Sequence, residues 1–110
     1  MADRLKIRCQ IDDDDPDLDK LSICRYFYYP PDRDWERDGI SLGRNTQIKE
    51  LRLGAGLRDF VRRDEIRAFC SGLYGNESIE RLNVYCNQLF GGEIFNILLP
   101  FFEQIATFVV

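Results

Sequence analysis

Histidine is absent from this 110-residue chain, and its absence removes the commonest routes to catalysis. Serine and cysteine nucleophiles are usually activated by a histidine base, so neither a Ser-His-Asp nor a Cys-His arrangement can form. The phosphate-binding pattern G-x-x-x-x-G-K-S/T is also missing from the sequence. Carboxylates are plentiful, but nothing in the sequence pairs them. We therefore expect the protein not to be an enzyme.

One glycine-rich stretch follows a predicted strand, which is the context of a dinucleotide-binding loop. It reads Gly54-Ala55-Gly56-Leu57-Arg58-Asp59, and Asp59 stands where the third glycine of G-x-G-x-x-G should be. The glycines are already explained as the loop after a strand. We expect no cofactor.

A run of acidic residues, Asp12-Asp13-Asp14-Asp15-Pro16-Asp17, offers the carboxylate oxygens that bind calcium. It lacks the glycine and the distant glutamate of an EF-hand loop. A solvated loop without a metal is the expected structure.

The four cysteines are Cys9, Cys24, Cys70 and Cys86, and none belongs to a C-x-x-C pair. Without histidine they make no familiar zinc site. Because free cysteine is among the most often buried residue types, the prediction is four free thiols used in packing. Redox chemistry and disulfides are the alternatives.

The net charge and the types of charged residue distinguish between a nucleic acid and a protein as the expected partner. The net charge is -4 at pH 7, whereas a nucleic-acid binder needs a basic face to neutralise phosphates. Twelve of the fifteen cationic residues are arginines, which pair with carboxylates and stack on aromatic rings at protein interfaces. A protein partner is therefore predicted, and no nucleic acid.

The most apolar stretch runs from Ile97 to Val110, and Pro100, Glu103 and Gln104 interrupt it. It is shorter than the roughly 20 residues that span a bilayer, and the N-terminus lacks the apolar core of a secretory signal. We expect no membrane segment and an intracellular, cytoplasmic location.

The elements that would position a binding site come from an internal repeat. Leu42 and Asn45 recur 31 positions later as Leu73 and Asn76, and these residues suit a helix end and a turn. Four apolar triplets share the spacing L-x-x-L-x-L. They are Leu18-Leu21-Ile23, Ile48-Leu51-Leu53, Ile79-Leu82-Val84 and Ile105-Phe108-Val110.

Helices are expected between the strands. Ile66, Phe69, Cys70 and Leu73 lie at helical spacing and would form one apolar face. Further helices are expected over residues 34–42 and 92–104, the latter kinked or shortened at a proline. At the N-terminus, Leu5, Ile7, Cys9 and Ile11 alternate with polar residues, which predicts a capping strand.

Residues 79 to 89 read Ile79-x-x-Leu82-x-Val84-x-x-Asn87-x-Leu89, which resembles the leucine-rich-repeat consensus L-x-x-L-x-L-x-x-N-x-L. The chain is similar to the ribonuclease-inhibitor-like subclass over roughly residues 16 to 110. The resemblance implies an α/β leucine-rich-repeat solenoid, a short horseshoe segment with parallel strands on its concave face and helices on its convex face. The consensus asparagine is replaced by Tyr26 and Gly56 in the first two repeats, so we expect irregular loops there.

The resulting domain prediction is a single leucine-rich-repeat domain over residues 1–110. Residues 1–16 would form the capping strand and acidic loop, and repeats would start near residues 18, 48, 79 and 105. In such a repeat the triplets point inward, while the alternate strand residues point to the concave face. Those residues are Lys20, Ser22, Cys24, Glu50, Arg52, Gly54, Arg81, Asn83, Tyr85, Thr107 and Val109.

We predict that a protein partner binds this concave face. The partner-binding candidates are Lys20, Ser22, Glu50, Arg52, Arg81, Asn83 and Tyr85. The alternative is that these are solvated strand residues, since few interface residues carry binding energy.

An aromatic cluster, Tyr26-Phe27-Tyr28-Tyr29, follows the first predicted strand. Tyr26, Tyr28 and Tyr29 are candidates for an aromatic hot spot, because such side chains give large contact areas at low entropic cost. In the alternative, the cluster and Trp35 cover the N-terminal end of the core.

The last triplet reaches Val110 with no polar cap after it. An open apolar edge promotes association. A fragment of a longer repeat array, or a structural unit that forms a homo-oligomer through this strand, is therefore the alternative to a simple interaction module. Local masking of the edge is a third explanation.

Overall fold

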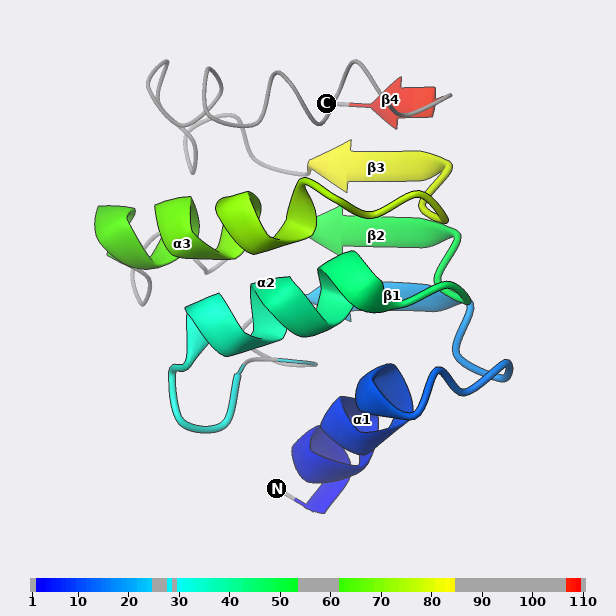
Figure 1. Ribbon diagram of the computed structural model, residues 1–110, viewed down its shortest axis with the longest axis horizontal. Coiled ribbons are helices and arrows are strands. Elements are labelled where there is room, and N and C mark those ends of the chain that lie inside the picture. Colours follow the sequence, from blue (N-terminus) through cyan, green and yellow to red (C-terminus); the bar gives the residue numbers. More distant parts are fainter. Residues whose placement is uncertain (1, 25–27, 29, 54–61, 85–106, 110) are drawn as a thin grey trace.

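A computed structural model describes residues 2–24, 28, 30–53, 62–84 and 107–109 (Figure 1). Within these residues three helix–strand units follow one another, and a further strand comes after them. The elements are α1 (Ala2–Asp12), β1 (Lys20–Ile23), α2 (Trp35–Arg44), β2 (Glu50–Leu53), α3 (Arg63–Leu73), β3 (Arg81–Val84) and β4 (Thr107–Val109). In the described part of the chain no helix is long and apolar enough to cross a membrane.

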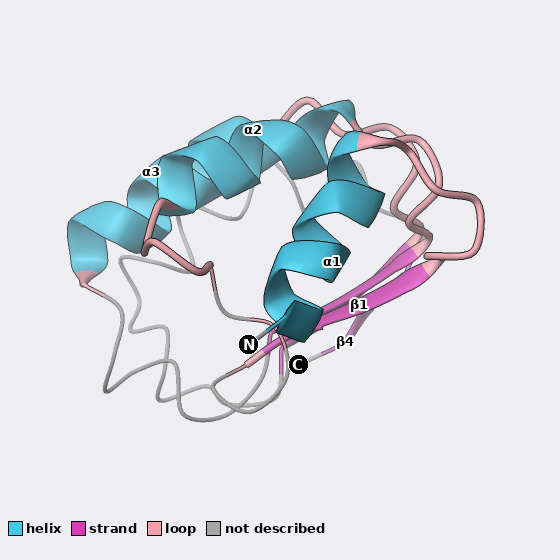
Figure 2. Ribbon diagram, turned by 90° about the horizontal axis from the view of Figure 1, so that it is seen from below, coloured by secondary structure: helices cyan, strands magenta, loops and turns pink. Residues whose placement is uncertain are grey.

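The strands form one parallel sheet in the order β1-β2-β3-β4. The helices lie together on one side of it (Figure 2). The register aligns Leu21 with Leu51 and Leu51 with Leu82, so the central residue of each predicted triplet forms one row. The predicted parallel α/β arrangement is confirmed, and so are the predicted helices near residues 34–42 and 64–73. The predicted helix over 92–104 lies outside the described residues.

Because successive side chains of a strand point to opposite faces of the sheet, every second side chain faces the helices. Leu21, Leu51 and Leu82 are almost completely buried, with exposed fractions of 1%, 0% and 0%. Trp35 of α2 and Phe69 of α3 meet above them edge to face, with ring centroids 5.5 Å apart. The core therefore lies between the sheet and the helices.

The predicted N-terminal capping strand is wrong, because this segment is helix α1. Ile11 is buried and Ile7 packs against the core, whereas Leu5 is 55% exposed and Cys9 is exposed. Ile7 and Ile11 are four residues apart and share one face of a helix. Of these four residues only Ile7 and Ile11 pack against the core. The alternation of apolar and polar residues therefore does not correspond to a strand.

The cysteines divide between core and surface. Cys70 is buried on α3, as predicted, and burial raises the pKa of its thiol to about 12. Cys24 is half-buried and Cys9 is exposed, and all three are free thiols. Cys86 lies outside the described residues.

Two asparagines join successive units through the backbone. The Asn45 amide donates to the carbonyl of Ile11 at 3.1 Å, and its oxygen accepts the amides of Gln47 and Ile48 at 2.8 Å. Asn45 therefore ties the turn before β2 to the end of α1.

Asn76 repeats this arrangement 31 residues later. Its amide donates to the carbonyls of Leu42 and Asn45 at 2.7 and 3.0 Å, and its oxygen accepts the amides of Ser78 and Ile79. We call this pair of side chains the asparagine ladder. The ladder contacts α1 through Asn45 and α2 through Asn76. Helix α1 therefore occupies the same position in the first unit as α2 does in the second.

Helices α2 and α3 approach so closely that glycine is required where they touch. A Cβ atom on Gly39 would lie 2.4 Å from the carbonyl oxygen of Phe69. One on Gly43 would lie 2.2 Å from the carbonyl oxygen of Gly72, and one on Gly72 would lie 2.5 Å from the backbone of Gly39. No larger side chain fits there without moving a helix.

Gly39→Ala is expected to destabilise the protein, although alanine is the better helix former. The gain in helix propensity is about 1 kcal/mol, whereas moving α2 away from α3 costs about 3 kcal/mol. The net loss of about 2 kcal/mol corresponds to a fall in Tm of about 10 °C, which thermal unfolding followed by circular dichroism measures. Gly75→Ala is the matched control, because a Cβ there meets nothing within 4 Å. An equal fall in Tm for both variants would contradict the packing explanation.

Candidate partner-binding face

The side of the sheet that faces away from α2 and α3 carries two rows of polar side chains. Lys20, Glu50 and Arg81 are aligned across β1, β2 and β3. Ser22, Arg52 and Asn83 form the second row. These six residues are called the open face below.

The structure brings together six of the seven predicted partner-binding residues. Tyr85 and Gly54 lie outside the described residues, and the side chains of Thr107 and Val109 are not described. Cys24 follows β1 and is half-buried. The alternation rule therefore placed the open face correctly over the three strands.

Glu50 lies at the centre of the open face, and its side chain is only 9% exposed. The Nε atom of Arg52 donates to its Oε2 atom, and Nη1 of Arg81 is 3.8 Å from its Oε1 atom. The hydrogen bond from Arg52 lowers the pKa of Glu50 most; burial opposes this, and the charges of Lys20 and Arg81 add to it. Glu50 is therefore ionised at neutral pH and holds both guanidinium groups beside it.

The open face has the opposite sign of charge to the whole protein. It combines three cationic side chains with one carboxylate, whereas the chain carries a net charge of -4. The side chains of Arg52 and Arg81 are 39% and 53% exposed. Positive charge that is partly exposed and held in position can pair with carboxylates of a partner.

The aromatic hot-spot prediction is wrong for Tyr28, which is completely buried. Its hydroxyl donates to Oδ2 of Asp38 at 2.5 Å. Burial and this hydrogen bond raise the pKa of Tyr28 above its usual range. The alternative prediction, that the cluster covers the core, fits Tyr28. Tyr26 and Tyr29 lie outside the described residues.

Around Asp38 the structure contains a buried polar cluster that the sequence did not indicate. Asp38 is 2% exposed and accepts hydrogen bonds from Nε of Arg8 at 3.1 Å, from the Tyr28 hydroxyl and from Nη1 of Arg37 at 3.2 Å. A second Arg8 nitrogen, Nη2, is 3.0 Å from the same carboxylate. These partners come from three segments of the chain, so the cluster joins α1 to α2.

The acidic run is not simply a solvated loop, because two of its members contact the second unit. Asp12 accepts a hydrogen bond from Nη2 of Arg37 at 2.6 Å. Asp14 accepts from the amide of Thr46 at 2.7 Å and from its hydroxyl, and these bonds lower the pKa of Asp14. Among the described residues no group of three or more acidic or cysteine side chains is arranged to hold a metal.

A groove of about 640 Å³ lies on the helix side between α1 and α2. Asp12 and Asp14 are in its wall and are already paired, as described above. Ser41 and Arg44 also line it.

No family model, no curated protein and no solved structure matches this chain. Its function has to be inferred from its own residues.

Proposed function

We propose that the chain is a leucine-rich-repeat module that binds a protein partner through the open face. The observation that carries the proposal is the register of the open face. Six polar residues from three strands form two straight rows on one side of the sheet. Side chains gathered in this way form a continuous surface, which is how repeat proteins present binding sites.

The leucine-rich-repeat interpretation has separate support. The asparagine and the strand of the second unit recur 31 residues later in the third, each after a helix, and the asparagine ladder contacts the preceding unit at each step. Buried leucines occupy corresponding positions in the strands. On this interpretation the open face is the concave face of a solenoid, and the protein has no catalytic role or cofactor.

The alternative function is a structural unit that associates with other copies. The specific observation in its favour is that β4 is the last strand in the order of the sheet and pairs with β3. Among the described strands none covers its other edge, and free strand edges favour pairing. Light scattering from dilute to concentrated solution tests it, and a monomer throughout removes it.

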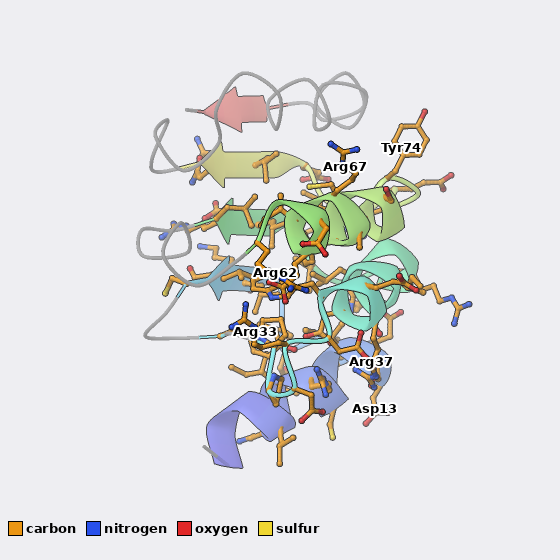
Figure 3. The ribbon with its side chains drawn as sticks, turned by 90° about the vertical axis from the view of Figure 1, so that its left-hand side faces the viewer. Asp13, Arg33, Arg37, Arg62, Arg67 and Tyr74 are labelled. Carbon is orange, nitrogen blue, oxygen red and sulfur yellow. The ribbon has the colours of Figure 1, made fainter. Side chains whose placement is uncertain are left out.

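Panning a library of displayed random peptides against the immobilised chain tests the interaction module. We expect the selected peptides to lose binding to the double variant Ser22→Tyr/Asn83→Tyr, because bulky rings in the second row block the open face. The control is Arg44→Tyr/Arg67→Tyr, which places the same rings on exposed positions of α2 and α3. Figure 3 shows that Arg67 lies on the helix side, away from the sheet. Peptides that lose binding only to the control would contradict the assignment of the face.

A further inference from the structure

We infer that the groove between α1 and α2 is a second docking site, which takes an amphipathic helix of a protein partner. The partner helix carries Lys or Arg one turn away from a large apolar side chain. The groove lies on the helix side, so this inference goes beyond the proposed function and does not depend on the open face. Its basis is an exposed apolar residue in the groove with uncompensated carboxylates one turn away.

The apolar contact that the groove offers is Ile40 of α2, which is 41% exposed. Among the described residues the other exposed large apolar side chains are Leu5 and Tyr74, and neither lines the groove. A concave site surrounds the side chain that packs in it. Burying Ile40 under a partner therefore removes more apolar surface from water here than on a convex helix face.

The end of the groove near the start of α2 carries uncompensated negative charge. Asp34 caps α2 by accepting from the amide of Arg37 at 3.1 Å, and Glu36 is exposed in the first turn. Neither carboxylate is ion-paired with a cation of the described part of the chain. The cations around them already have carboxylate partners. These pairs are Arg8 with Asp32 and Asp38, Arg33 with Glu65, and Arg37 with Asp12 and Asp38. A basic side chain of a partner is therefore attracted to this end.

The opposite end of the groove is closer to neutral. Arg44 lines it, about 12 Å from Glu36 along α2. Asp14 lies in the wall at the same end, because it accepts from the amide of Thr46 at 2.7 Å. The charges of Arg44 and Asp14 have opposite signs, so this end has little preference for either sign of charge. The basic group of the partner therefore belongs at the Glu36 end.

The walls of the groove favour a helix over an extended segment. Glu36 and Ile40 are four residues apart, so they share one side of α2 and are separated by about 6 Å along it. Lys and Leu four residues apart on a partner helix have the same separation and can meet both at once. An extended segment gains affinity by pairing with a strand edge. The residues that line the groove belong to α1, α2 and the residues next to them, so they offer no such edge.

Fluorescence anisotropy with two labelled helical peptides tests the inference on the full chain. One is an alanine-rich peptide with Lys and Leu four residues apart, and the other has Glu in place of each Lys. We expect only the Lys peptide to bind the wild type, and Asp34→Asn/Glu36→Lys to weaken its binding by about tenfold. Asparagine still caps α2, so the helix should persist. The same double variant should bind the Glu peptide, because the charges of the contacting groups are exchanged.

The charge-matched control is Glu77→Lys/Glu80→Gln, which changes two exposed carboxylates outside the groove and should alter affinity by less than about twofold. Ile40→Ser leaves the charge unchanged and should weaken the Lys peptide severalfold with little change in Tm. No binding of the Lys peptide, equal binding of both peptides to the wild type, or equal losses in the two carboxylate variants would overturn the inference. Ser22→Tyr/Asn83→Tyr should bind the Lys peptide as the wild type does. A loss of binding there would place the peptide on the open face, so this inference would fail while the proposed function stood.

Discussion

Asp38→Ala is expected to cost about 3–5 kcal/mol of folding free energy, which is a large part of the stability of a small domain. The physical reason is that the substitution removes the carboxylate that neutralises Arg8, whose side chain is only 11% exposed. It also leaves the hydroxyl of buried Tyr28 without its acceptor. Urea unfolding followed by circular dichroism should show a much lower midpoint with an unchanged slope.

Asp32→Ala is the matched control for this prediction. Asp32 also pairs with Arg8, at 3.3 Å, but its side chain is 79% exposed. An ion pair of this kind contributes at most about 1 kcal/mol. A loss for Asp32→Ala as large as that for Asp38→Ala would show that burial of the charge is not the cause.

A second control separates the unpaired charge from the lost contact. Arg8→Met/Asp38→Leu removes both charges and fills their volume with apolar groups. Such exchanges of buried pairs are often neutral or stabilising, so the double variant should recover most of the stability lost in Asp38→Ala. Tyr28→Phe tests the remaining hydrogen bond and should cost about 1 kcal/mol. A double variant as unstable as Asp38→Ala would contradict the explanation by unpaired charge.

The spacing of apolar residues predicted the parallel sheet and the open face, because both depend on local periodicity. A triplet such as Ile48-Leu51-Leu53 fixes which strand residues are buried, and alternation then fixes Glu50 and Arg52 on the other side. The sequence alone therefore predicts that these side chains share one surface. Their partner-binding role stays a prediction.

The buried cluster and the role of α1 could not be predicted in this way. Helical spacing places Asp38 on the same face as Trp35 and Leu42, but a carboxylate is expected to avoid burial unless a partner neutralises it. Its burial depends on Arg8 and Tyr28, which lie 30 and 10 positions away. The structure of the N-terminal segment was predicted wrongly for a related reason. Its apolar residues fit both the alternation of a strand and the four-residue spacing of a helix, and only packing against the rest of the fold selects the helix.

Asn76→Ala is expected to be the other strongly destabilising substitution, with a loss of about 4 kcal/mol. Asn76 is 3% exposed, and its amide oxygen accepts from the backbone N–H groups of Ser78 and Ile79, both at 2.8 Å. Its amide nitrogen donates to the carbonyls of Leu42 and Asn45. Alanine leaves the N–H groups of Ser78 and Ile79 without this acceptor, at about 1–3 kcal/mol for each that water cannot reach. The carbonyls of Leu42 and Asn45 lose one donor each and keep the Asn45 amide and the Ser78 hydroxyl.

Asn83→Ala is the matched control, since Asn83 is a half-buried asparagine of the open face that lies outside the ladder. Its substitution should change the stability by less than about 0.5 kcal/mol. Asn76→Asp gives a sharper test, because aspartate keeps an acceptor for Ser78 and Ile79 but has no N–H for the preceding unit. Its carboxylate would face the carbonyls of Leu42 and Asn45, so we expect a loss at least as large as with alanine, and chemical denaturation measures it.

The ladder prediction also tests how the units depend on one another. Asn76 lies in the turn between α3 and β3, yet two of its partners belong to the second unit, so its loss should loosen both units together. Hydrogen exchange should then show reduced protection for the amides of β2 as well as those of β3. Reduced protection confined to β3 would mean that Asn76 stabilises only its own turn, and the units would be joined by their apolar contacts alone.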